Sequence, residues 1–281
     1  VAGVHSVYIF GILVSAVGMS LYLAHSLGQS RLVEIENERK THELTQAREL
    51  QLSMLPRELP KFSGLDLAAA TQTAAEVGGD YYDLKPAAPD AVLVAFGDAT
   101  GHGLASGVLV TAAKALFTSL PGDGPLAEML EACDRVLREM RLGRLQMCLT
   151  LARISPREAA VASAAMPPVL LHRAATGAIE ELGAGGLPLG SPLAARYEER
   201  RTPLAPGDTL LFASDGFAEL LDSLGNELGF ARAAETFREA ARGVSASSVA
   251  ERLGAAVSSF RGARPQEDDV TFLVVRVTPS L

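Results

Sequence analysis

Hydrophobic residues are distributed very unevenly along this chain of 281 residues. Residues 1–30 contain no Asp, Glu, Lys or Arg, and the stretch from Val7 to Leu27 is almost continuously apolar. About 20 such residues, at a helical rise of about 1.5 Å each, match the hydrocarbon thickness of a bilayer. Tyr8 and Tyr22 lie near its two ends, where aromatic rings favour the membrane interface. The pattern therefore predicts a transmembrane helix within residues 1–30.

Two alternatives to a membrane span are a cleaved signal peptide and a buried core helix. A signal peptide has a basic N-terminal region and an initiating Met, whereas this sequence begins at Val1 with neither. A core helix that is apolar all round would need a cover that the neighbouring sequence does not offer. Because the initiating Met is absent, we expect a longer protein with a sensor region before Val1.

Basic residues follow the apolar stretch, and none precedes it. Arg31, Arg39, Lys40 and Arg48 all come after residue 30. The positive-inside rule then places everything after the span in the cytoplasm. We therefore expect a protein of the cell inner membrane with one visible span and a cytoplasmic catalytic domain.

The segment after the apolar stretch has the composition of an exposed helix. Residues 31–55 are charged, rich in helix-forming residues and free of Gly and Pro, and Pro56 and Pro60 end the segment. The apolar positions do not keep a clean heptad, so a helical connector is favoured over a stable coiled coil, and a homodimer through this helix is our first expectation. The predicted organisation is a membrane segment at 1–30, a helical linker at 31–60 and a catalytic domain at 61–281.

From residue 61 the pattern changes to short apolar runs separated by Gly, Pro and Asp. Alternation and β-branched content predict six strands, and helical periodicity predicts four helices. The strands are expected at 66–74, 91–99, 146–154, 160–166, 208–216 and 269–277, and the helices at 104–119, 125–141, 231–241 and 245–260. Because several strands follow one another between helices, the order favours a layered α+β fold over a regular βαβ winding.

Composition and charge exclude several classes of function. Hydrophobic residues make up 48% and charged residues 21% of the chain, as in a folded globular protein. A net charge of -8 offers no broad basic surface, so we expect no nucleic-acid partner. The two cysteines, Cys133 and Cys148, lack CxxC spacing, which excludes a disulfide scaffold and a structural zinc site.

Acidic residues recur at the ends of the predicted strands. Asp98 and Asp215 each end an apolar run before a glycine, Asp268 and Asp269 begin the last strand, and Asp80 follows Gly-Gly. A single Asp in such a place is most often a turn residue or helix cap, but several beside buried runs are costly unless paired or bound to metal. Carboxylates without thiolates or a histidine cluster suit Mg²⁺ or Mn²⁺, and two such ions could clamp a displacement at phosphorus.

The motifs LQLSMLPRELP, EVGGDYYD, GDATGHG, SDGFAE and EDDVT occur in this order. In order and spacing they resemble the SpoIIE/RsbU-type bacterial serine phosphatases, the bacterial branch of the metal-dependent PP2C superfamily. The resemblance covers residues 48–278. It implies an α/β sandwich of two antiparallel sheets flanked by helices, with a site for two divalent cations, Mn²⁺ or Mg²⁺, at one edge.

The resemblance also implies a role for each motif acid. Asp98 would bridge the two cations, and the backbone carbonyl of Ala99 would bind one of them. Asp215 and Asp268 would hold the other cation, while Asp80 would act directly or through a water molecule. A water molecule acidified by both cations would then attack the phosphorus of a phosphoserine or phosphothreonine.

Other residues of these motifs are candidates for supporting positions. Asp269 is the alternative to its neighbour Asp268 as a ligand. Glu76, His102 and Glu219 could support the site or simply occupy turns and solvated positions. The chain departs from the pattern at AAMPP (164–168), where relatives read Ala-Gly-His-Pro and Met166 replaces the usual histidine. This departure leaves the proposed ligands intact but puts substrate docking in question.

The family resemblance implies a phosphorylated STAS-domain protein, an anti-sigma-factor antagonist, as the substrate in a partner-switching pathway. One rival interpretation is a catalytically silent module that binds and sequesters the STAS partner. The presence of all four motif acids argues against it. A second rival is a hydrolase of small phosphoesters or nucleotides, against which the chain offers no tryptophan and only 5% aromatic residues for base stacking.

Overall fold

A computed structural model describes residues 2–56, 58–72, 78–101, 103–183 and 185–279. Within these ranges, the side chains of residues 2–10, 12–14, 16, 32–33, 44, 47–48 and 104 are not described. The chain divides into two compact units, Val1–Gln46 and Ala47–Leu281. The first unit is helical, and the second holds all the strands of the described residues.

Helix α1 (Ala2–Met54) contains both of the N-terminal segments that the sequence predicts to be helical, and it ends two residues before Pro56 as expected. Part of the predicted membrane span at 7–27 consists of side chains outside the described set. Among the described residues, no helix is long and apolar enough to cross a membrane. The predicted membrane span is therefore not found among the residues that the structure describes.

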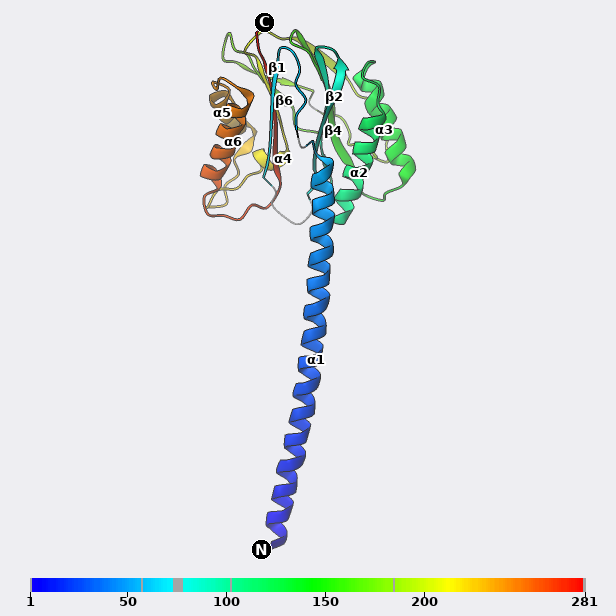
Figure 1. The fold of residues 1–281 in the computed structure, drawn as a ribbon, viewed down its shortest axis with the longest axis vertical. Coiled ribbons are helices and arrows are strands. Elements are labelled where there is room, and N and C mark those ends of the chain that lie inside the picture. Colours follow the sequence, from blue (N-terminus) through cyan, green and yellow to red (C-terminus); the bar gives the residue numbers. More distant parts are fainter. Residues whose placement is uncertain (1, 57, 73–77, 102, 184, 280–281) are drawn as a thin grey trace. The chain divides into compact units, whose positions relative to one another are not determined.

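The second unit is a sandwich of two five-stranded antiparallel sheets, with strand orders β1-β10-β9-β6-β7 and β2-β3-β4-β5-β8. Figure 1 shows α5 and α6 on one side of the paired sheets and α2 and α3 on the other. The first sheet comprises β1 (Leu65–Gln72), β10 (Val270–Val277), β9 (Thr209–Ala213), β6 (Val169–His172) and β7 (Ile179–Leu182). The second comprises β2 (Asp80–Ala88), β3 (Ala91–Ala99), β4 (Met147–Ile154), β5 (Glu158–Ala164) and β8 (Glu199–Pro203). The helices are α2 (Leu104–Ser119), α3 (Leu126–Met140), α4 (Asp215–Ala218), α5 (Gly229–Ala240) and α6 (Ala246–Arg261).

Three apolar layers hold the sandwich together. One lies between β2–β5 and helices α2 and α3, and it includes the fully buried Tyr81 and Leu130. The middle layer lies between the two sheets, where the rings of Phe96 and Phe212 pack 5.9 Å apart. The third lies under α5 and α6 and contains Phe237. Strands such as β3 and β10 are buried on both faces, which explains why they read as nearly continuous apolar runs.

The layered α+β sandwich that the sequence predicts is confirmed, and all six predicted strands and four predicted helices are present within a few residues of their expected bounds. Sequence patterns missed β2, which contains Pro86. That residue is tolerated because β2 is an edge strand with a register shift at this point. They also missed β6, β7 and β8, which have only four or five residues each and are too short for a periodic signal.

Candidate metal centre and active site

Two of the predicted site acids are cross-strand neighbours in one sheet. Asp80 begins β2, Asp98 lies near the end of β3, and the antiparallel register pairs them directly. Residues opposite each other in such a pair point to the same face of the sheet and lie about 5 Å apart at their Cα atoms. The local sequence thus places two carboxylates side by side at one edge of the sandwich.

The other sheet supplies the remaining acids. Asp215 directly follows β9 as the first residue of α4, and Asp268 and Asp269 directly precede β10, the strand that pairs with β9. Ser214 holds the two ends together, because the Ser214 amide donates to the Thr271 carbonyl at 3.1 Å and the Thr271 amide donates to the Ser214 hydroxyl at 3.0 Å. The end of β9 and the start of β10 therefore present their acids together.

A glycine turn allows the two sets of acids to meet. A Cβ atom built at Gly79 would overlap the Asp98 carboxylate and approach the Ala99 carbonyl oxygen to 2.6 Å. A Cβ atom at Gly78 would overlap the Asp269 carboxylate. The Ala99 amide donates to the Gly79 carbonyl at 3.0 Å and fixes the turn against β3. Only glycine leaves room here for carboxylates from both sheets.

Burial and mutual repulsion make these carboxylates hard to ionise. Burial, followed by the charges of Asp215, Asp268 and Asp269, raises the pKa of Asp98 to about 7. Burial is also the main cause that raises the pKa of Asp80 well above its usual value, and interactions with the Thr271 and Ser214 hydroxyls offset only part of this. The pKa of Asp215 is raised by burial and by the charge of Asp268. The site concentrates negative charge, and the charges of Asp98, Asp215 and Asp268 each raise the pKa of a neighbouring acid.

The carboxylate oxygens of this site are suitable ligands for divalent cations, although the described side chains are not close enough together to surround an ion. Among the described residues, no three acidic, histidine or cysteine side chains are arranged closely enough to hold an ion. However, the Asp80 Oδ2 atom is buried without a hydrogen-bond partner. None of the ion pairs within the described ranges involves Asp80, Asp98, Asp215 or Asp268. Buried carboxylate oxygens that lack a counter-charge are the ligands that Mg²⁺ and Mn²⁺ prefer.

The remaining predicted site residues have different outcomes. Ala99 is buried at the end of β3, where its carbonyl lies beside Gly79. Asp268 is exposed while Asp269 is buried, and both affect the pKa of Asp98. Glu219 is exposed, yet burial of its carboxyl group and the charges of Asp215 and Asp268 raise its pKa, so it borders the cluster. Glu76 and His102 lie outside the described residues.

Sequence reasoning missed two polar contacts on the glycine turn. The side chain of Gln51, near the end of α1, is buried and donates to the Gly78 carbonyl at 2.6 Å. The Ser106 hydroxyl of α2 donates to the same carbonyl at 3.2 Å. For Gln51, the one sequence feature that could have indicated a role at the site is its position in the LQLSMLPRELP motif.

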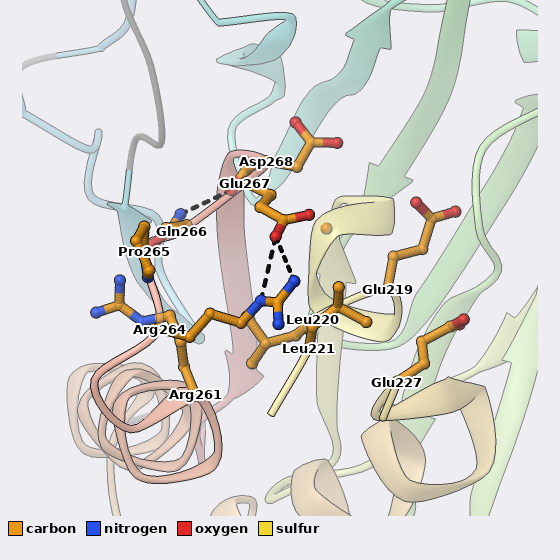
Figure 2. A pocket seen from close by; sticks show the side chains of 11 residues that line it. Glu219, Leu220, Leu221, Glu227, Arg261, Arg264, Pro265, Gln266, Glu267 and Asp268 are labelled. Carbon is orange, nitrogen blue, oxygen red and sulfur yellow. Dashed lines mark hydrogen bonds and ion pairs between the residues drawn. The ribbon is translucent and has the colours of Figure 1, made fainter. Parts of the chain in front are cut away.

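A pocket of about 350 Å³ opens beside the acid cluster. It is lined by α4 and the following loop, by the end of α6 and by the segment that leads to Asp268. Figure 2 shows Glu219 and Glu227 on one side of this pocket and Arg261 and Arg264 on the other. The acid cluster therefore has an adjoining pocket that contains both signs of charge.

Comparison with known proteins identifies the family. The model of the family named Stage II sporulation protein E (SpoIIE) matches residues 88–278. The chain belongs to the SpoIIE family. This confirms the resemblance that the motifs indicated.

Individual relatives of this SpoIIE-family chain agree with the assignment. It is 25% identical to the phosphoserine phosphatase RsbU of Bacillus subtilis (strain 168) over 180 residues, which cover 63% of this chain and 53% of RsbU. The chain thus spans about half the length of this curated relative.

Two solved structures share its fold at 25% identity. The SiaA-PP2C domain of Pseudomonas aeruginosa superimposes with a TM-score of 0.75 and covers 86% of this chain and 98% of that one. The RsbU and RsbW domains of Rv1364c from Mycobacterium tuberculosis give a TM-score of 0.66 over 81% of this chain and 64% of theirs. The chain therefore has the fold of PP2C-type phosphatases, related to RsbU and SpoIIE.

Proposed function

We propose that this chain is a protein serine/threonine phosphatase that depends on two divalent cations, Mn²⁺ or Mg²⁺. The observation that supports this most strongly is the cluster of partly buried carboxylates at the edge where the two sheets of a PP2C fold meet, in which Asp80, Asp98, Asp215 and Asp268 form no ion pair with any described residue. A phosphate dianion would be repelled from such a cluster unless cations neutralised it. The same cations would lower the pKa of water and stabilise the charge that develops during displacement at phosphorus.

The assignment of ligands follows the motifs. Asp98 would hold both cations, since its pKa responds to acids from the other sheet, and the Ala99 carbonyl would bind one of them. Asp215 and Asp268 would hold the second cation, because the charge of Asp268 raises the pKa of Asp215. Asp80 is buried beside Asp98 and would act directly or through water.

The proposed substrate is a phosphoserine STAS-domain protein of a partner-switching pathway. The relative named RsbU and the similar structure of the RsbU and RsbW domains of Rv1364c support this class of partner. The alternative is a silent module that binds the STAS protein without hydrolysing it. Retention of Asp80, Asp98, Asp215 and Asp268 favours the enzyme, since a module that only binds would not need to keep a cluster that costs stability.

We also propose that the end of α1 controls the site, in a homodimer formed through residues 31–55. Gln51 and Ser106 donate to one carbonyl, that of Gly78, so a rotation of α1 would move the turn against which Asp98 and Asp269 pack. The Gln51→Ala variant should then alter phosphatase activity several-fold, and Gln29→Ala, an exposed change on the same helix, should not. Equal activity of the two variants would contradict this control.

The central test is phosphate release by the whole chain, with and without Mn²⁺, from a phosphoserine STAS protein and from p-nitrophenyl phosphate. The control pair is Asp98→Asn and Asp90→Asn, the latter an exposed residue in the turn between β2 and β3. We expect turnover that requires Mn²⁺, is lost only in Asp98→Asn, and is faster with the STAS protein. Binding of the STAS protein without turnover by a folded, metal-loaded chain would instead establish the silent module.

A further inference from the structure

The pocket beside the acid cluster has an unusual distribution of charge on its walls. It adjoins the proposed cation site directly, because Asp268 and Gly216 belong to its lining. Glu219 and Glu227 lie on the wall that faces the basic side chains (Figure 2). A protein substrate whose phosphoserine reaches the cations would therefore bring its neighbouring residues into this pocket, since an extended chain advances only about 3.3 Å per residue.

The two arginines of the pocket differ in their partners. The Arg264 guanidinium donates through Nε and Nη2 to Glu267 Oε1, at 3.1 and 2.6 Å. Arg261, the last residue of α6, has no hydrogen bond or ion pair from its guanidinium to any described residue. Its Nε atom is buried and unpartnered. Arg264 is thus neutralised within the protein, whereas Arg261 is not.

The buried Nε–H group lies out of reach of a ligand, so a ligand in the pocket would be bound by the Nη1 and Nη2 groups of the half-buried Arg261, which have no partner among the described residues. The planar guanidinium matches a carboxylate, to which it can donate two parallel hydrogen bonds. We infer that Arg261 is a specificity-determining residue that binds an acidic side chain of the substrate, within about three residues of the phosphoserine. This inference rests on the proposed phosphatase function and deepens it by naming a sequence feature of the substrate.

The acidic wall does not cancel this preference. Glu219 is exposed and faces solvent, and Asp268 belongs to the proposed cation site, where bound cations would neutralise it. Glu267 is already paired with Arg264. Glu227, like Glu219, is exposed and makes no ion pair among the described residues. Of the two arginines that line the pocket, Arg261 is therefore the one whose positive charge is free to meet an acidic side chain.

The test uses phosphoserine peptides that are identical except for one residue, Asp, Asn or Lys, at each of the three positions on either side of the phosphoserine. At one or more positions, the whole chain with Mn²⁺ should prefer Asp to Asn by roughly tenfold in kcat/KM. Arg261→Ala should abolish this ratio, and Arg261→Lys should retain part of it. Arg252→Ala removes the same charge from an exposed site on the same helix, outside the pocket, and should keep the full ratio.

Charge reversal gives the sharpest outcome, because Arg261→Glu should turn the preference from Asp to Lys. Measuring the dissociation constants of the same peptides on the Asp98→Asn protein tests the pocket without turnover. A preference in binding with no hydrolysis by the unaltered chain would overturn the phosphatase proposal but support Arg261. No preference for Asp in either measurement, or a preference that persists in Arg261→Ala, would overturn the role of Arg261.

Discussion

Two clusters of buried charge in this protein are built in opposite ways. In the first, Arg173 donates to Asp208 at 3.0 Å and makes a double contact with Glu180 at 2.7 and 2.8 Å. The other carboxylate oxygen of Asp208 accepts from the Ala174 amide at 2.9 Å, so each carboxylate of the cluster has a cationic partner and the buried Asp208 also has its hydrogen bonds. In the second, Asp80 and Asp98 lie side by side with further acids and without a cation from the described residues.

The difference distinguishes a structural cluster from a functional one. The Arg173 cluster links β6 and β7 to the β8–β9 connection, and the positive charge of Arg173 stabilises both carboxylates. The carboxylate cluster opposes folding, because burial and repulsion raise the pKa of its members. A fold retains such a cost where a ligand supplies the missing charge.

The strongest test of this comparison exchanges one carboxylate in each cluster. Asp208→Ala would leave Arg173 partly buried without its partner and should lower the free energy of unfolding by about 3 kcal/mol. Asp98→Asn removes a repelled charge, so it should leave the metal-free protein as stable or more stable, yet reduce phosphate release more than about a hundredfold. Thermal unfolding and phosphate release on both variants measure this contrast. Loss of stability in Asp98→Asn comparable to that of Asp208→Ala would contradict it.

A smaller change at the glycine turn should separate the acids without removing any of them. In Gly79→Ala, the new Cβ would overlap the Asp98 carboxylate, and the displacement should lower phosphate release by about ten- to a hundredfold. The affinity for Mn²⁺, measured by calorimetry, should fall with it. Gly28→Ala is the matched control, because nothing lies within 4 Å of the added atom in α1. Unchanged Mn²⁺ affinity in Gly79→Ala would show that the turn does not set the cluster.

Sequence alone predicts the carboxylate cluster but not the Arg173 cluster. Asp98 and Asp215 each end an apolar run before a glycine, and this local pattern recurs in a family motif. The partners of Arg173 lie on short polar segments that have no periodic signal, and they meet only through sheet pairing. For the same reason, the contact of Gln51 with Gly78 and the unpaired Arg261 could not be found from the sequence, since both depend on distant segments.

The carboxylate cluster also implies that the stability of the metal-free protein depends on pH, and that bound metal should remove this dependence. The pKa of Asp98 is raised to about 7 in the folded chain, so the folded state binds a proton that the unfolded state releases near pH 4. The stability of the metal-free protein should therefore fall as the pH rises from about 4 through 7. Bound Mn²⁺ favours the ionised acids and should remove this loss.

The measurement is the midpoint of thermal unfolding between pH 5 and 8, in EDTA and in Mn²⁺. Other groups contribute, among them His172, whose pKa burial lowers, so that its contribution to stability increases with pH. The difference in the unfolding midpoint between the unaltered chain and Asp98→Asn, taken at each pH, gives the contribution of Asp98 alone. Identical pH profiles for the two proteins in EDTA would show that Asp98 is not repelled in the folded state.

The smallest expected effect concerns backbone strain at Ala165, which lies in neither charge cluster. Ala165, in the AAMPP turn after β5, has a φ of 62°, a conformation that L-residues adopt with strain. The family resemblance described above implies an Ala-Gly-His-Pro run here, with glycine in the place of Ala165. Ala165→Gly should relieve the strain, and after the entropy that glycine gains in the unfolded chain it should stabilise the protein by about 0.5–1 kcal/mol.

Ala175→Gly is the matched control for Ala165→Gly. Ala175 lies in an exposed turn and is not among the described residues of positive φ, so the same substitution there should destabilise by about 0.5 kcal/mol. Denaturant unfolding measures both variants, and phosphate release should be equal in both, because neither residue touches the acid cluster. If Ala165→Gly instead lowered phosphate release, the strained backbone of this turn would contribute to the active site. The strain at Ala165 would then serve the function, as the repulsion among the carboxylates does.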